Sequence, residues 1–171
     1  MILVLVIAVD IISGVAVAGE KDKIADAGSD NAIELKACGP KTAEVNFSAD
    51  TNKNDHPTPT PADGKAMVYV LRPTMMGNKV QTKLAVDGDW KGVNRGNTYF
   101  FFELAPGEHY VCSKAENHNV MTLNIEAGKT YYLQQHIAMG VLKARTSIEV
   151  MPDDEAKLKL AKLHLATWEK K

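Results

Sequence analysis

Residues 80–107 read VQTKLAVDGDWKGVNRGNTYFFFELAPG, and the residue pattern of this stretch indicates the fold class. From Val80 to Val86, apolar and polar side chains alternate, as they do in a strand with one buried face. Asp87-Gly88 follows as a hairpin turn of the type that needs positive φ, which glycine tolerates. Pro106-Gly107 is interpreted as a second hairpin turn. The pattern therefore predicts short strands joined by tight turns.

The same rhythm continues outward from this stretch, between Met67 and Met151. Turn residues recur at roughly ten-residue intervals, the spacing typical of an all-β sandwich or barrel. They are Gly88, Gly96, Gly107, Asn117, Gly128 and Gly140. Met67–Leu71 is apolar on both faces, which suits a central strand. We expect an all-β fold over residues 65–151, an antiparallel β-sandwich of about seven to eight short strands.

Residues 152–171 are predicted to form a C-terminal α-helix packed on the sandwich. Pro152 suits the first position of a helix, and the acidic residues that follow it suit the positive end of the helix dipole. Leu158, Leu165 and Trp168 share one stripe of that helix. An apolar stripe of this kind predicts docking on the sheet.

The first eighteen residues are almost wholly apolar and end in Ala16-Val17-Ala18. This A-x-A pattern fits signal-peptidase cleavage before Gly19, so residues 1–18 are predicted to be a signal peptide. Asp10 inside the apolar run leaves a second interpretation open, in which the segment is a first core strand or helix. A stable transmembrane anchor after processing is not expected, because a segment this short with a central carboxylate barely spans a bilayer. We expect an exported protein, periplasmic or extracellular.

Residues 19–64 are predicted to be an N-terminal segment followed by a linker. A short edge strand is expected at Ala43–Phe47. In residues 50–64, Pro57, Pro59 and Pro61 stand at alternate positions. Prolines at this spacing favour an extended polyproline II path. The linker is therefore expected to be a spacer or a strap laid along the domain surface.

Cys38 and Cys112 are the only two cysteines in the chain. In an oxidising compartment an even cysteine count indicates paired thiols, so a disulfide is expected to staple the N-terminal segment onto the sandwich. The alternative is two separate thiols, with Cys112 a small core hydrophobe. Lys36 falls inside the would-be lipobox before Cys38, which argues against lipid anchoring there.

Trp90, Asn94 and Arg95, with Tyr99 following, form the candidate ligand-binding surface. Aromatic, amide and guanidinium groups on a β-sandwich loop could hold a glycan or a peptide. The alternative is a polar hairpin whose Trp90 caps the edge of the sandwich.

Four blocks of the sequence resemble a bacterial envelope family, the one catalogued as domain of unknown function 2846. The blocks are Val68–Pro73, Val86–Gly88, Tyr99–His109 and Ala127–Leu133. Their V-D-G, P-G-x-H and A-G-K rhythm is also similar to the PEGA-type surface modules of bacteria. The resemblance covers about residues 65–151 and implies an extracytoplasmic β-sandwich, often on a signal-bearing or lipidated precursor. It implies no assigned biochemical activity.

Charge and motifs narrow the function without assigning it. Twenty basic and twenty-one acidic residues give a net charge of -1, which argues against nucleic acid as a partner. The histidines lack metal-site spacings, and no serine stands in a G-x-S-x-G turn, so no catalytic residue, metal or cofactor is predicted. We favour a non-catalytic module that binds an envelope component or a protein partner. The alternative is a small, hydrolase-like exported enzyme with an unrecognised site.

Overall fold

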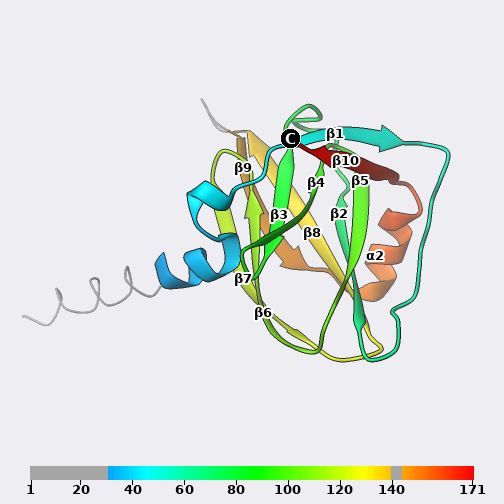
Figure 1. Cartoon of the computed structure of the whole chain (residues 1–171). Coiled ribbons are helices and arrows are strands. Elements are labelled where there is room, and N and C mark those ends of the chain that lie inside the picture. The colour runs from blue at the N-terminus through cyan, green and yellow to red at the C-terminus, as the bar shows by residue number, and fades with distance from the viewer. Residues whose placement is uncertain (1–30, 140–143) are drawn as a thin grey trace, which may run out of the picture.

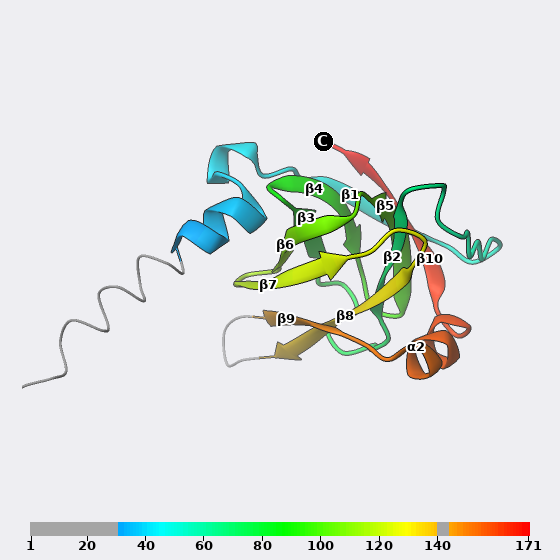
Figure 2. The same cartoon turned by 90° about the horizontal axis from the view of Figure 1, so that it is seen from below.

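The computed structural model describes residues 31–139 and 144–171. The predicted signal peptide over residues 1–18 and the predicted turn at Gly140 lie outside the described residues. Two sheets form the body of the protein (Figures 1 and 2). One has the strand order β1-β10-β5-β2-β8-β9 and the other β4-β3-β6-β7. The predicted β-sandwich is confirmed, and the described residues form ten strands where about seven to eight were expected.

The elements follow one another along the chain as η1 Lys41–Ala43, β1 Phe47–Asn52, β2 Ala66–Arg72, β3 Thr82–Val86, β4 Asp89–Asn94, β5 Thr98–Leu104, β6 Gly107–Lys114, β7 His118–Ile125, β8 Thr130–Met139, β9 Ala144–Val150, α2 Asp153–Leu160 and β10 His164–Lys170. Residues 31–38 are helical as well. None of the described helices is long and apolar enough to cross a membrane.

The strand β2 lies at the centre of the six-stranded sheet, and all of its residues are buried. It pairs with β5 in antiparallel fashion and with β8 in parallel fashion. The pairing of β10 with β5 is also parallel, whereas the remaining pairs are antiparallel. Apolar side chains on both faces of β2 explain its position, because one face meets the second sheet and the other meets α2.

The alternation in β5 divides its aromatic residues between two apolar cores. Phe100 and Phe102 point between the sheets, where they join the main core. Tyr99 and Phe101 point to the outer face of the six-stranded sheet, where α2 covers them through a second core. The result is three layers, with the outer layer made by a single short helix and the chain around it (Figure 2).

The predicted C-terminal helix is shorter than expected: α2 ends at Leu160, and β10 follows. Leu158 is exposed, so it does not dock the helix. Within β10, Leu165 packs on the outer core beside α2 while Trp168 packs between the sheets. In a strand, side chains three positions apart lie on opposite faces. Leu165 and Trp168, which were expected to share one helical stripe, therefore pack into two different cores.

Two further sequence interpretations need correction. Pro106-Gly107 joins β5 to β6, which lie in different sheets, so it is a crossover and not a hairpin. The edge strand expected at Ala43–Phe47 is β1, which starts at Phe47 and runs into the predicted linker. The Asp87-Gly88 hairpin is confirmed, because both residues have positive φ values, 53° and 80°.

Candidate functional site

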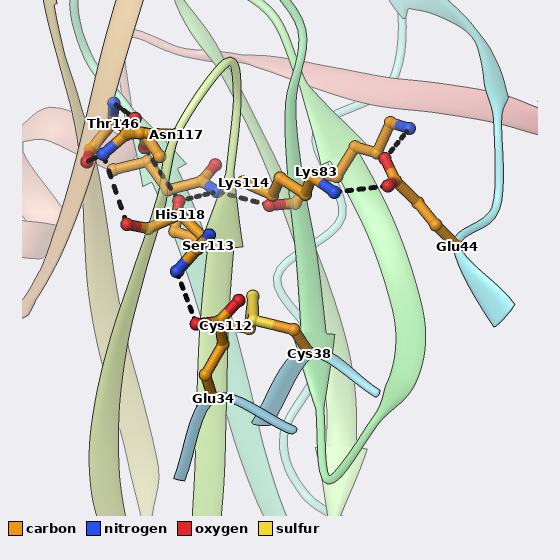
Figure 3. Close-up of a disulfide and its surroundings, with 11 residues drawn as sticks. Glu34, Cys38, Glu44, Lys83, Cys112, Ser113, Lys114, Asn117, His118 and Thr146 are labelled. Carbon is orange, nitrogen blue, oxygen red and sulfur yellow. Dashed lines mark hydrogen bonds and ion pairs between the residues drawn. A yellow bond between two sulfur atoms is a disulfide. The ribbon is translucent and has the colours of Figure 1, made fainter. Parts of the chain in front are cut away.

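The predicted disulfide between Cys38 and Cys112 is present, with Cα atoms 5.1 Å apart (Figure 3). It joins the helical residues 31–38 to β6. Both cysteines are buried in a third apolar cluster, which includes Trp90. The N-terminal segment is therefore part of the folded body, which begins well before residue 65.

Glu44 fastens the same segment a second time. Its carboxylate forms ion pairs with Lys83 on β3, at 2.7 Å, and with Lys114 on β6 (Figure 3). Burial by itself would raise the pKa of the Glu44 carboxyl, but the hydrogen bonds and charges of Lys114 and Lys83 outweigh it and hold the pKa below its ordinary value. Glu44 therefore stays ionised and ties two strands of the smaller sheet to the segment after η1.

The predicted ligand-binding surface is wrong, because three of its four residues are buried. Trp90 packs beside the disulfide. The Asn94 side chain lies between the sheets, where it donates hydrogen bonds to the Val70 carbonyl and to Gln135 Oε1, each at 3.1 Å. Arg95 is half-buried at the turn, and Tyr99 lies on the outer face of the other sheet. The alternative, a polar hairpin whose Trp90 caps the edge of the sandwich, is nearer to the structure, in which Trp90 is buried against Ala37 and Cys38 of the N-terminal segment.

The described histidines that pair with carboxylates each do so with a single acidic residue. His109 bonds the Asp87 carboxylate at 2.6 Å, and His136 bonds Glu149 at 2.8 Å. Across residues 31–139 and 144–171, no group of three or more histidine, cysteine, aspartate or glutamate side chains could hold a metal ion.

A buried arginine organises the loop after β2. The Arg72 guanidinium donates hydrogen bonds to the carbonyls of Met76, Gly77 and Val80. Burial lowers the pKa of Arg72 to about 10. The group still carries its charge at neutral pH, and it satisfies three loop carbonyls. Its role is structural.

Among the described residues, the most site-like feature is a pocket of about 360 Å³ on the outer face of the six-stranded sheet. It lies between α2 and the proline-rich residues 57–61, which run alongside the helix (Figure 1). We call residues 57–61 the strap. The pocket is lined by His56, Thr58, Pro59, Thr60, Tyr69, Thr130, Tyr132, Lys157, Leu160 and Ala161. Aromatic rings and a few polar groups of this kind are typical of a small ligand site.

Three tyrosines on neighbouring strands form the floor beneath the strap and the pocket. Tyr99 is on β5, Tyr69 on β2 and Tyr132 on β8. The ring centroids of Tyr99 and Tyr69 are 6.5 Å apart, and those of Tyr69 and Tyr132 are 5.4 Å apart in a stacked arrangement. We call these three residues the tyrosine ladder.

The strap rests on the first two tyrosines of the ladder. The Tyr99 hydroxyl donates to the Pro57 carbonyl at 3.0 Å, and the Tyr69 hydroxyl donates to the Pro59 carbonyl at 2.7 Å. Burial raises the pKa of Tyr69 and of Tyr99 to about 12, so both hydroxyls keep their protons and remain donors at neutral pH. The Tyr132 hydroxyl makes no hydrogen bond to another described residue.

Sequence reasoning expected a strap along the domain surface but did not find the tyrosine ladder. Each tyrosine lies on the outward face of its own strand. The sequence of each of these strands predicts an ordinary buried strand, so the tyrosine does not stand out. Only the order β5-β2-β8 brings the three together, and strand order is not a local property of the sequence. A tyrosine on each of three strands, together with a nearby proline-rich segment, was the available signal.

The two packed sheets place the protein in the class of β-sandwich proteins. An aromatic pocket, with no metal cluster among the described residues, does not by itself identify an activity. The chain belongs to the family described as Protein of unknown function (DUF2846), which matches residues 62–147. The tyrosine ladder lies within the matched residues, whereas the strap, β1 and β10 lie outside them.

A relative is known from Haemophilus influenzae, strain Rd, where it is described as an uncharacterized protein. It is 25% identical over 108 residues, which cover 63% of this chain and 64% of the relative. This chain therefore spans less than two thirds of the relative's length. No solved structure matches.

Proposed function

We propose that this protein is an exported, non-catalytic binding module of the bacterial envelope, and that its ligand site is the pocket between the strap, the tyrosine ladder and α2. The observation that carries the proposal is the pocket itself. It combines stacked rings of Tyr69 and Tyr132 with a hydroxyl, on Tyr132, that no described residue uses. Both rings are largely buried, so the pocket offers a ligand their exposed edges and one hydrogen-bonding hydroxyl.

Export is supported by the disulfide. A bond between Cys38 and Cys112 persists in oxidising compartments and is rare in the reducing cytosol. The predicted signal peptide over residues 1–18 points to the same compartment. An envelope component or an envelope protein is therefore the proposed partner.

Binding is favoured over catalysis by the chemistry of the pocket lining. His56 is the lining residue best suited to general-base work, but its Nε2 donates to the Leu160 carbonyl at 2.9 Å. No carboxylate among the described lining residues orients the ring as a base would need. The hydrolase-like alternative gains no support from this site.

The experiment is capture of ligands from a solubilised envelope fraction with the tagged, mature protein, followed by mass spectrometry. Thr130→Trp fills the mouth of the pocket from β8 without removing a core side chain. Thr122→Trp is the matched control, because Thr122 is exposed on β7 in the other sheet.

We expect wild type and Thr122→Trp to capture the same component and Thr130→Trp to lose it. Equal capture by all three proteins would refute the pocket as the ligand site. Recovery of the wild-type protein from the cytoplasm, with both thiols free, would refute export.

A further inference from the structure

We infer that the tyrosine ladder is a recognition surface for proline-rich peptide segments in the polyproline II conformation, and that the strap occupies it as a built-in competitor. This inference rests on the proposed function, since it names the ligand class of the same site. The partner is thus a protein with an extended, proline-rich segment.

The spacing of the ladder fits a polyproline II backbone. Tyr99 and Tyr69 bond the carbonyls of Pro57 and Pro59, two residues apart. A polyproline II helix rises about 3.1 Å per residue, so carbonyls two residues apart are separated by about 6.2 Å. The ring centroids of the two tyrosines are 6.5 Å apart, so the two hydroxyls can reach carbonyls at about this separation along an extended, proline-rich chain.

The contacts that hold the strap are generic to such peptides. Proline has no N–H, and a polyproline II segment makes no internal hydrogen bonds, so its carbonyls are free to accept from outside. Aromatic grooves recognise proline-rich segments in this way, through ring contacts and donors to backbone carbonyls. The two tyrosine hydroxyls bond backbone atoms of the strap, and another segment with the same spacing can make the same bonds.

The ladder extends beyond the strap. A straight continuation past Pro59 would carry the chain toward Tyr132. The chain turns away, because the Ala62 N–H donates to Glu103 Oε1 on β5 at 2.8 Å and Lys65 pairs with the same carboxylate at 3.1 Å. Tyr132 is largely buried, but it lines the pocket beside the strap, and that pocket stays open. A longer segment that continues across the ladder would contact three tyrosines, whereas the strap bonds two.

An external peptide can displace the strap, because few contacts hold it in place. Pro57, Thr58 and Thr60 of the strap are exposed, whereas Pro59 and Pro61 are half-buried. Next to the strap, His56 bonds the Leu160 carbonyl of α2 and packs on Tyr99. A tethered segment competes at a high effective concentration, so it weakens the apparent affinity of every external peptide without abolishing it. Loosening the strap should therefore raise the affinity for a peptide added in solution.

The test uses the mature, disulfide-bonded protein and a fluorescent synthetic peptide with the sequence of residues 53–64. Binding is measured by fluorescence anisotropy to wild type and to the triple variant Pro57→Gly, Pro59→Gly, Pro61→Gly. Glycine at these positions makes the strap more flexible and leaves the ladder intact. We expect the triple variant to bind the peptide at least about tenfold more tightly than wild type does, from the combined entropic effect of three prolines.

Two further arms test the ladder itself. In the triple-variant background, Tyr69→Phe removes one hydroxyl and keeps the ring. Tyr131→Phe is the matched control, because Tyr131 stands next to Tyr132 on β8 but points between the sheets. We expect Tyr69→Phe to weaken peptide binding several-fold more than Tyr131→Phe, and we expect a peptide with glycine in place of its prolines to bind no variant.

A triple variant that keeps its cooperative thermal unfolding but binds the peptide no better than wild type overturns the inference. Equal effects of Tyr69→Phe and Tyr131→Phe do so as well. Either result leaves the proposed function standing if Thr130→Trp still abolishes capture from the envelope fraction. Loss of that capture difference, with peptide binding intact, would refute the proposed function instead.

Discussion

Removing the disulfide should be the most destabilising simple change to this protein. Cys38 and Cys112 are separated by 74 positions, so the bond closes a long loop. The chain-entropy model gives roughly 4 kcal/mol for a loop of this length, from the conformations that the bond denies to the unfolded chain. We therefore expect Cys38→Ala with Cys112→Ala to reduce the free energy of unfolding by about 4 kcal/mol.

The assay is urea unfolding under non-reducing conditions, followed by tryptophan fluorescence. Trp90 packs in the same cluster as the disulfide and reports on that region. Reduction of the wild-type protein with a thiol is the control, because it removes the same cross-link and keeps the sulfur atoms in place. A loss below about 1 kcal/mol, the range of ordinary substitutions, would refute the entropic argument. A large loss in the double variant and a small one on reduction would assign the effect to packing.

Three further predictions concern single side chains. The ring of Trp168 is half-buried and meets Phe100 edge-on at 5.0 Å, so Trp168→Ala should cost about 2 kcal/mol in urea unfolding, less than a fully buried ring would. The pKa of Glu44 is lowered in the folded protein, so its carboxylate stabilises the fold above its ordinary value of 4.5, and this contribution is lost as the pH falls through the folded pKa. Glu44→Gln should remove that part of the acid dependence of the free energy of unfolding, and an unchanged pH profile would contradict the ion-pair account. The pKa values of Tyr69 and Tyr99 are raised from 10.0 to about 12, so their stabilising effect should be intact below pH 10.0 and lost between pH 10.0 and about 12. Phenolate absorbance should show a late phase that Tyr69→Phe reduces, and its absence would contradict the burial of these hydroxyls.

The parts of the fold that could be predicted from the sequence depend on neighbours in the chain. The positive φ of Asp87-Gly88 is a local property, and the structure confirms it. The strand predicted from the alternation over Val80–Val86 is present but begins at Thr82, and Ala85 is buried as well, so the alternation holds only in part. Met67–Leu71 were predicted to be a central strand because apolar side chains lie on both faces of this segment, so both faces are expected to be buried. The disulfide could be predicted from the cysteine count and the expected compartment, without knowing how far apart the two cysteines lie in space.

The rest depends on partners that are far away in the sequence. Residues 164–170 read HLATWEK, in which leucine, alanine, glutamate and lysine all favour helix. They form β10 because β1 and β5 stand on either side and satisfy its backbone groups. The tyrosine ladder was missed for the same reason. Trp90, in contrast, was expected on a ligand surface because a polar loop surrounds it in sequence, whereas the N-terminal segment covers it in space.

The place of β10 also sets the order in which the protein can fold. It is the last of the described strands along the chain, yet it lies between β1, the first of them, and β5 in the middle. Until β10 exists, β1 has no neighbour in its sheet, and β5 has an unpaired edge. The six-stranded sheet therefore cannot be completed before residues 164–170 have been synthesised, and its closure pairs residues more than a hundred positions apart, such as Ala49 and Trp168. Such long-range pairing is slow. Completion of the six-stranded sheet is therefore expected to be a late step in folding.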